Sequence, residues 1–327
     1  MPRWFLFLER FGLVAITALV IVIFALHPGT SDTFMTVANW RSILGTMSIQ
    51  LLLAAAFTLP LITGKIDVSS GSIAVMSSVI LAGLIGSVDV PLTGVVGLNW
   101  MVAAVVAIAV GGGLGAVNGV LVRAGADPLI ATLSLSIVLG GLVSGYAQGR
   151  AIVAGMPAGL TDLGRLSFGP FPMLFLVAAV ACIGVWFLLE RTSFGRRLHA
   201  IGVNPTAAHL IGVRVDRTVF TAFVLGGVIA GIAAVVLTAR QGGGVPVNGL
   251  NLVLPALAGT YLGATTIRPG EFNVPGTFVG LLFVSVTVSG LTLLGVEAWV
   301  QPVFTGGALV AAVLVAHWFQ KLATKDT

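Results

Sequence analysis

Long runs of apolar residues alternate with short polar segments along the whole chain. Ten such runs fall at residues 11–27, 43–62, 71–88, 100–122, 129–146, 171–189, 218–239, 250–266, 276–296 and 299–319. A helix of about 20 residues crosses a hydrocarbon core about 30 Å thick, and these runs have roughly that length. The pattern predicts an all-α polytopic membrane protein with about ten transmembrane helices.

Composition supports the same fold class. Of the 327 residues, 57% are hydrophobic and only 8% are charged, which is far from the balance of a soluble domain.

The first run is followed by His27, Pro28 and Gly29 rather than by a small-residue cleavage site. We therefore expect this run to be retained as the first transmembrane helix.

The basic residues predict the orientation of the chain in the membrane. If the N-terminus is cytoplasmic, twelve of the 16 lysines and arginines fall in cytoplasmic segments and four in external ones. This excess follows the positive-inside rule and predicts cytoplasmic termini and a cytoplasmic segment 190–217. The formal charge of +5 is interpreted as a topological signal, and no nucleic-acid partner is expected.

The sequence offers little for metal, redox or catalytic chemistry. Cys182 is the only cysteine and lies inside an apolar run, which excludes an intrachain disulfide and a cysteine-based metal cluster. The four histidines are dispersed, and no nucleophile with an adjacent base is visible. We expect no metal site, no catalytic residue and no cofactor bound by this chain.

Glycines are frequent and recur at regular spacings. Many of the 43 glycines, such as Gly111, Gly115 and Gly119, follow a four-residue spacing that lets helix backbones approach closely. Others bound the short segments Gly64–Gly71 and Gly242–Gly249. Tight helix packing explains most of these glycines, while the two short segments are candidates for helix breaks around a translocation path.

The longest charged stretch, residues 190–217, carries the clearest local signal outside the apolar runs. Within it, Asn204 is a suitable N-cap, Pro205 suits the first helical position and Gly212 suits the end of a helix. The pattern predicts a short helix from Asn204 to Leu210. The small side chains of Ala207 and Ala208 suggest a flat docking face, although an ordinary cytoplasmic loop with topological arginines would have a similar composition.

Several sequence blocks resemble one transporter family. Residues 191–213 read RTSFGRRLHAIGVNPTAAHLIGV, which resembles the coupling loop of the ribose/xylose-type ABC transporter permeases, a basic F-G-R stretch followed by G-x-N-x-x-A-A-x-x-x-G-I/V. Four more segments of this chain resemble further blocks of that family and occur in the same order. They are TGKIDVSSGS (63–72), GAVNGVLVRAGADPLIATLS (115–134), PGTFVGLLF (275–283) and SGLTLLGV (289–296). The resemblance covers about residues 40–315, and several ordered blocks are more specific than any single one.

The chain departs from the family pattern in two places. Residues 258–265 read AGTYLGAT where the family commonly has A-A-x-x-x-G-G-x-S, and Val288-Ser289-Gly290 replaces the usual N-N-G. These departures concern the identity of the substrate rather than the fold.

The resemblance implies a binding-protein-dependent importer of the bacterial inner membrane. Residues 1–327 would form one transmembrane permease domain with 190–217 as its cytoplasmic coupling loop. It would import a sugar or sugar-like neutral solute by alternating access, surrounded by membrane lipid, with a second permease (a copy or a paralogue), a cytoplasmic ABC ATPase and a periplasmic solute-binding protein. The residues matched to the family's ATPase-coupling element are Gly195, Arg196, Arg197, Gly202, Asn204, Pro205, Ala207, Ala208 and Gly212.

ATP hydrolysis is expected on another chain. None of the three lysines, Lys65, Lys321 and Lys325, completes the G-x-x-x-x-G-K-[ST] phosphate loop of ATPases. ATP and Mg would therefore bind the partner ATPase.

Polar residues within or between the apolar runs are candidates for the translocation path. Asp67 needs a partner or water, because a carboxylate in the bilayer centre costs roughly 2.5 to 3.5 kcal/mol. A charged pair with Lys65, a lining or gating role and a proton relay are the alternatives for it. The candidate path residues are Gln50, Asp67, Ser69, Asn118, Thr132 and Ser134. For Asn118 a hydrogen bond between helices is the main alternative.

A proton-coupled secondary carrier for a small polar solute is the principal rival function. In that case Asp67 would be the coupling carboxylate, whereas the segment 190–217 would be unnecessary. The scarcity of ionisable residues inside the apolar runs argues for a neutral substrate.

Overall fold

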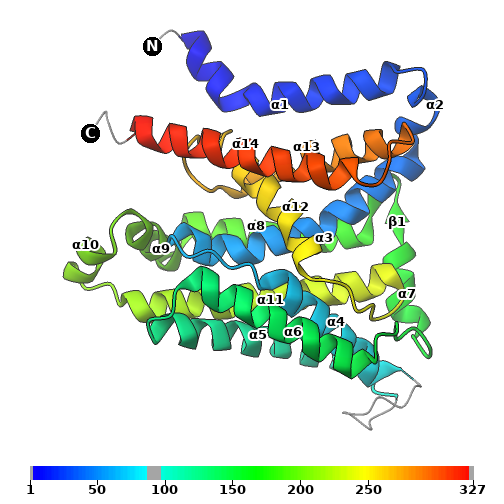
Figure 1. Ribbon diagram of the computed structural model, residues 1–327, viewed down its shortest axis with the longest axis horizontal. Coiled ribbons are helices and arrows are strands. Elements are labelled where there is room, and N and C mark those ends of the chain that lie inside the picture. The colour runs from blue at the N-terminus through cyan, green and yellow to red at the C-terminus, as the bar shows by residue number, and fades with distance from the viewer. Residues whose placement is uncertain (1–2, 87–96, 324–327) are drawn as a thin grey trace.

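A computed structural model describes residues 3–86 and 97–323 (Figure 1). Helices make up most of the described chain. Its helices are α1 (Arg3–Leu26), α2 (Ser31–Phe34), α3 (Val37–Ile62), α4 (Ser70–Ile85), α5 (Trp100–Arg123), α6 (Pro128–Ala147), α7 (Ala158–Arg165), α8 (Met173–Arg191), α9 (Ser193–Val203), α10 (Pro205–Leu210), α11 (Val215–Gln241), α12 (Leu250–Gly263), α13 (Val274–Leu293) and α14 (Val300–Ala323). Strands β1 (Ser167–Phe168) and β2 (Phe171–Pro172) form a short antiparallel hairpin.

Each of the ten predicted apolar runs coincides with a helix, although residues 87–88 of the third run lie outside the described residues. Among the described residues, six helices are long and apolar enough to cross a membrane: α3, α5, α6, α8, α11 and α13. Shorter apolar helices occupy the other four runs, in α1, α4, α12 and α14. The helical fold class and multiple membrane spans are confirmed, and the total of about ten crossings stays a prediction.

The two ends of the helix bundle differ in what they carry. Figure 1 shows the start of α1 and the end of α14 at the same end as α9 and α10, here called the α10 end. Helix α7 and the β1–β2 hairpin lie at the opposite end, here called the α7 end. The predicted topology requires both termini and segment 190–217 to share one side, and this arrangement agrees with it. That this side is the cytoplasm stays a prediction from the charges.

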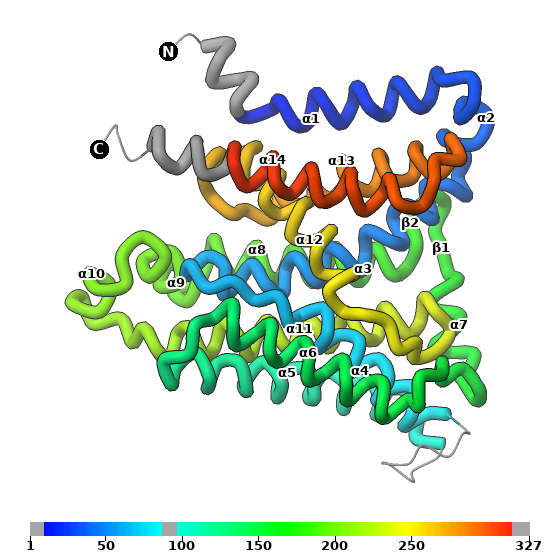
Figure 2. The backbone as a smooth tube through the Cα atoms, in the orientation of Figure 1, coloured from blue at the N-terminus to red at the C-terminus, as the bar shows by residue number. Residues whose placement is uncertain are grey.

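Helix α11 is the centre of the bundle and packs against α3, α4 and α5. Its contact with α5 is glycine-mediated: a Cβ on Gly115 would overlap the Phe223 carbonyl oxygen, and one on Gly111 would overlap that of Gly227. Helix α12 crosses from this group toward α13 and α14 (Figure 2). The close backbone approach predicted from the glycine spacing is therefore present, and it is what such small residues permit in a membrane.

We expect Gly115→Ala to destabilise the protein and Gly113→Ala to leave it unchanged or slightly more stable. Both residues lie on α5, but a Cβ at Gly113 has no atom within 4 Å, whereas one at Gly115 meets the backbone of α11. Overpacking of this kind costs about 1 to 3 kcal/mol. Thermal unfolding of the two purified variants in detergent measures the difference, and equal melting temperatures would contradict the packing described.

The two glycine-bounded segments meet inside the molecule. The chain leaves helical structure between α3 and α4 and again between α11 and α12. Gly71, at the start of α4, lies so close to Gly249 that a Cβ on Gly71 would overlap the Gly249 carbonyl oxygen. Nearby, the hydroxyls of Ser78 and Thr238 are 2.7 Å apart and join α4 to α11. Both glycine-bounded segments thus interrupt helical structure, as predicted. The sequence did not predict that the two segments contact each other.

Four short elements were not predicted: α2, α7, α9 and the β1–β2 hairpin. They are polar or mixed in sequence, and the apolar pattern gives no signal for them. The segment 190–217 consequently differs from the prediction of a loop with one helix, because α9 precedes α10 within it.

Candidate functional site

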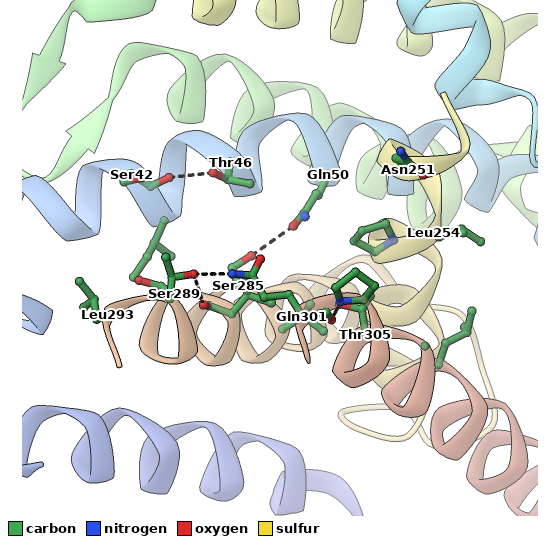
Figure 3. Close-up of a pocket in the computed structure, with 18 of the residues that line it drawn as sticks. Ser42, Thr46, Gln50, Asn251, Leu254, Ser285, Ser289, Leu293, Gln301 and Thr305 are labelled. Carbon is green, nitrogen blue, oxygen red and sulfur yellow. Dashed lines mark hydrogen bonds between the residues drawn. The ribbon is translucent and has the colours of Figure 1, made fainter. Parts of the chain in front are cut away.

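A cavity of about 770 Å³ lies between α3, α12, α13 and α14 (Figure 3). We call it the central pocket. Its polar lining consists of hydroxyls and amides, and none of the described lining residues is ionisable. The lining residues are Asn39, Ser42, Ile43, Thr46, Gln50, Asn251, Leu254, Pro255, Val284, Ser285, Val288, Ser289, Thr292, Leu293, Gln301, Pro302, Thr305, Gly306 and Leu309.

Hydrogen bonds across the central pocket join its walls. Ser285 on α13 donates through Oγ to Gln50 Oε1 on α3 at 3.2 Å, and Ser289 donates to Asn39 Oδ1 at 2.9 Å. Gln301 on α14 donates through Nε2 to a hydroxyl of α13. Figure 3 shows Gln50 and Ser285 facing each other across the gap between their helices. The pocket therefore presents neutral donors and acceptors that can exchange their mutual hydrogen bonds for bonds to a solute.

The helical repeat explains why these side chains share one pocket. On α3 the polar residues Asn39, Ser42, Thr46 and Gln50 are spaced by three or four positions, which places them on one helix face. The polar residues of α13 follow the same spacing. Only Gln50 among the lining residues was predicted from sequence. A polar stripe inside an otherwise apolar helix is the signal that would have found the others.

An arginine braces the wall of the central pocket without lining it. Arg240, near the end of α11, donates from Nη2 to Thr46 Oγ1 at 2.8 Å. Its guanidinium lies against Gly45, where a Cβ would overlap it. The arginine therefore holds Thr46 in place on the pocket face of α3.

Four of the predicted path residues gather elsewhere, in a buried polar cluster between the α3–α4 break, α5 and α6. Asp67 is only 2% exposed, and Ser69, Asn118 and Thr132 are fully buried. Asp67 Oδ1 accepts hydrogen bonds from the backbone N–H of Ser69 at 2.8 Å and from its hydroxyl at 2.6 Å. Asn118 Nδ2 donates to the same hydroxyl at 2.6 Å. None of the four lines the central pocket.

The proposed charged pair between Lys65 and Asp67 is not formed. In the described part of the chain the ion pair found is the one between Arg268 and Glu190. The Asp67 carboxylate instead accepts hydrogen bonds from polar groups at the start of α4. Backbone groups that a helix break leaves unpaired inside the protein need such partners. Asn118 joins α5 to the break by a hydrogen bond, which is the alternative to a path-lining role that the sequence suggested for this residue.

Ser134 lies apart from the other predicted path residues. It is exposed on the outer face of α6, while Thr132, two residues earlier, turns inward and lies within 3.4 Å of the Val68 backbone N–H. Residues two apart on a helix point in different directions, which is why the structure separates them.

The predicted helix in segment 190–217 is confirmed as α10. Asn204 Oδ1 accepts a hydrogen bond from the Ala207 backbone N–H at 3.0 Å, and Pro205 is the first helical residue. Gly212 follows the helix with φ +88°, a left-handed conformation that glycine adopts without strain. The sequence-derived capping pattern was sufficient to locate this helix.

The flat docking face expected at Ala208 is wrong. Ala208 is only 2% exposed and packs inside the protein against Ile201, Val219 and Phe223. Ala207 is exposed. The sequence shows that both side chains are small, but which of them faces inward depends on how α10 packs against α9 and α11.

The glycines of the segment position its helices. A Cβ on Gly195 would overlap the Leu189 carbonyl oxygen at the end of α8, and one on Gly202 would overlap that of Ile62 at the end of α3. Arg196 and Arg197, between them, are exposed. Gly195 and Gly202 therefore fix α9 against the bundle, while the arginines remain accessible.

Three large apolar side chains stand out from the α10 end. Val203 is 89% exposed, Leu210 is 81% exposed and Ile211 is 77% exposed; together they are called the α10 patch. They lie in the charged segment, which the charges predict to be outside the membrane, and exposed apolar side chains gathered in such a segment are candidates for an interaction site. Sequence reasoning missed them, although apolar residues within an arginine-rich segment were the available signal.

Comparison with known proteins identifies the family. The model of a family described as "Branched-chain amino acid transport system / permease component" matches residues 39–313. The chain belongs to this family. It is therefore a permease component, and its apolar helices are those of a multi-pass membrane protein.

Curated relatives of this permease cover nearly its whole length. The ribose import permease protein RbsC of Bacillus subtilis (strain 168) is 33% identical over 299 residues, which cover 91% of this chain and 89% of that protein. RbsC of Escherichia coli (strain K12) is 29% identical over 312 residues, 94% of this chain and 93% of that protein. The D-allose transport system permease protein AlsC of E. coli is 28% identical over 319 residues, 97% and 94% respectively. The resemblance to sugar ABC permeases is confirmed. No solved structure matches the chain.

Proposed function

We propose that this chain is the membrane-spanning permease subunit of an ATP-driven ABC importer of the bacterial inner membrane. It carries a sugar or sugar-like neutral solute through the central pocket by alternating access. The observation that carries the proposal is the lining of this pocket, whose described residues include hydroxyl and amide side chains on α3, α12, α13 and α14 and no ionisable one. The sugar permeases among its relatives support the substrate class.

The pocket chemistry favours a sugar over an amino acid, although the family description names branched-chain amino acids. An amino acid carries an ammonium and a carboxylate, and moving such charges out of water is costly without opposite charges to receive them. A polyol needs only neutral hydrogen-bond donors and acceptors, which the pocket has along α3 and α13. Competition for uptake by unlabelled sugars and amino acids tests this choice, and inhibition by leucine alone would contradict it.

The α10 patch supports a partner ATPase as the source of energy. The patch is apolar, exposed and outside the bundle, and exposed arginines of α9 belong to the same segment. Docking there would let a cytoplasmic ATPase, which holds ATP and Mg, move α9 and α10 together. A second permease, either a copy or a paralogue, and a periplasmic solute-binding protein complete the proposed importer.

Gln50→Leu is expected to raise the KM of solute uptake by up to about tenfold. The change removes the amide that faces the pocket and leaves Ser285 without its partner, and one neutral hydrogen bond contributes about 0.5 to 1.5 kcal/mol. Gln241→Leu, at the exposed end of α11, is the matched control and should leave KM unchanged. Initial rates of labelled-solute uptake measure both, and equal effects would remove Gln50 from the path.

Asp67→Asn discriminates between the importer and the proton-coupled rival. The carboxylate binds Ser69 at the helix break, so the amide should lower transport by disturbing the break while ATP dependence persists. Uptake is measured with and without a protonophore at constant cellular ATP. If wild-type uptake collapses with the protonophore and the variant performs only exchange, the carrier hypothesis is favoured instead.

A further inference from the structure

A second cavity, of about 260 Å³, lies between α3, α8 and α13 and is distinct from the central pocket. We call it the α8 groove. Its lining is apolar, and Ile183, on its rim, is 62% exposed, so the groove opens on the outer surface of the bundle. The lining residues are Leu51, Ala179, Cys182, Ile183, Trp186, Val274, Pro275 and Phe278.

One end of the α8 groove is marked by an arginine. Trp186 lines the groove, and the guanidinium carbon of Arg191 lies 6.0 Å from the centre of the Trp186 ring. Arg191 is exposed, and among the described residues it has no acidic partner within ion-pair distance. The neighbouring carboxylate, Glu190, is engaged by Arg268. A positive charge thus remains uncompensated beside the groove.

We propose that the α8 groove binds one acyl chain of an anionic phospholipid, whose phosphate is held by Arg191. From Ala179 to Trp186 the groove follows about two turns of α8, or roughly 10 Å of an apolar chain. A polar solute would find almost no hydrogen-bond partner on this apolar lining, whereas an acyl chain needs none. A tryptophan followed by an arginine is the sequence expected where a membrane helix passes from the hydrocarbon region to the headgroups.

Charge complementarity selects an anionic rather than a zwitterionic lipid. Arg196 and Arg197 on α9 are also exposed, so three exposed arginines lie within seven positions of the sequence at the α10 end. Clusters of basic side chains at the end of a membrane helix attract anionic headgroups. The apolar groove orders one chain of the lipid, and Arg191, which lies beside Trp186, selects its headgroup.

Native mass spectrometry of the full-length protein in detergent tests the proposal. Dioleoyl-phosphatidylglycerol and dioleoyl-phosphatidylcholine are titrated separately, and the fraction of protein that retains one lipid is measured. We expect the anionic lipid to bind about fivefold more tightly, and Arg191→Gln to abolish this preference. Arg150→Gln, an exposed arginine in the segment between α6 and α7, should preserve it. Equal retention of the two lipids by the wild type would overturn the proposal.

The groove itself is tested by filling it. Ala179→Leu should weaken binding of the anionic lipid severalfold, whereas Val180→Leu, exposed on the same helix and absent from the groove lining, should not. A brominated phosphatidylglycerol should quench part of the tryptophan fluorescence, and this part should be lost in Trp186→Phe. Unchanged binding in Ala179→Leu, or quenching that persists in Trp186→Phe, would place the lipid elsewhere and contradict the proposal.

Discussion

Aspartate at both Leu210 and Ile211 is expected to reduce solute uptake by at least about 100-fold while the permease reaches the membrane in normal amounts. Both side chains are more than three-quarters exposed, so their replacement removes no internal packing. At an interface with the ATPase the two aspartates would place two charges in a desolvated contact. An unpaired interfacial charge costs several kcal/mol. Uptake and co-purification of the ATPase with the permease measure the effect.

The control for this variant is the apolar pair Leu210→Met and Ile211→Val, which should transport almost normally. Substitution of Ala208 by glutamate is a weaker test, because Ala208 is buried against α11 and the charge would disrupt α10 itself. Wild-type uptake with a normally stimulated ATPase in the double-aspartate variant would show that the α10 patch is not the docking surface.

Ser285→Trp is expected to block uptake almost completely and to leave ATPase co-purification intact. Ser285 lies on α13 opposite Gln50 (Figure 3), so an indole at this position would project into the central pocket and occupy the space between α3 and α13. Ser285→Ala removes only one neutral hydrogen bond and should retain most of the transport. Size-exclusion chromatography of the purified variant verifies that it folds, and near-normal uptake by a folded Ser285→Trp protein would exclude the pocket as the path.

The positions of the helices and one of their caps were predictable because they depend on local sequence. Each apolar run corresponds to a helix, and the Asn204-Pro205 pattern located α10. The four-residue glycine spacing likewise predicted close helix contacts. Their partners are on α11, more than a hundred residues along the chain, and sequence spacing alone does not identify them.

The candidate site was less predictable because it depends on which helix faces meet. Gln50 was selected for its polarity alone, and it does line the central pocket. Asp67 and Asn118 were selected for the same reason, yet they are buried around the α3–α4 break and bond to Ser69. A polar side chain in an apolar helix needs a partner in either case, so polarity does not separate residues that line a path from residues that stabilise a break.

The orientation of single side chains was the hardest feature to predict. Ala208 and Ala207 are chemically identical neighbours, and only the packing of α10 on α11 determines that the first is buried and the second exposed. The α10 patch was missed for a related reason, since Leu210 and Ile211 could equally have formed internal contacts.

The central claim is tested most directly by uptake into proteoliposomes that contain this permease with the ATPase and second permease of its transport system. ATP is enclosed, loaded solute-binding protein is added outside, and a protonophore is present throughout. The account predicts accumulation of a labelled neutral sugar that requires ATP and the binding protein and is unaffected by the protonophore. Accumulation driven by a proton gradient in liposomes that contain this chain alone, without ATP, would contradict it.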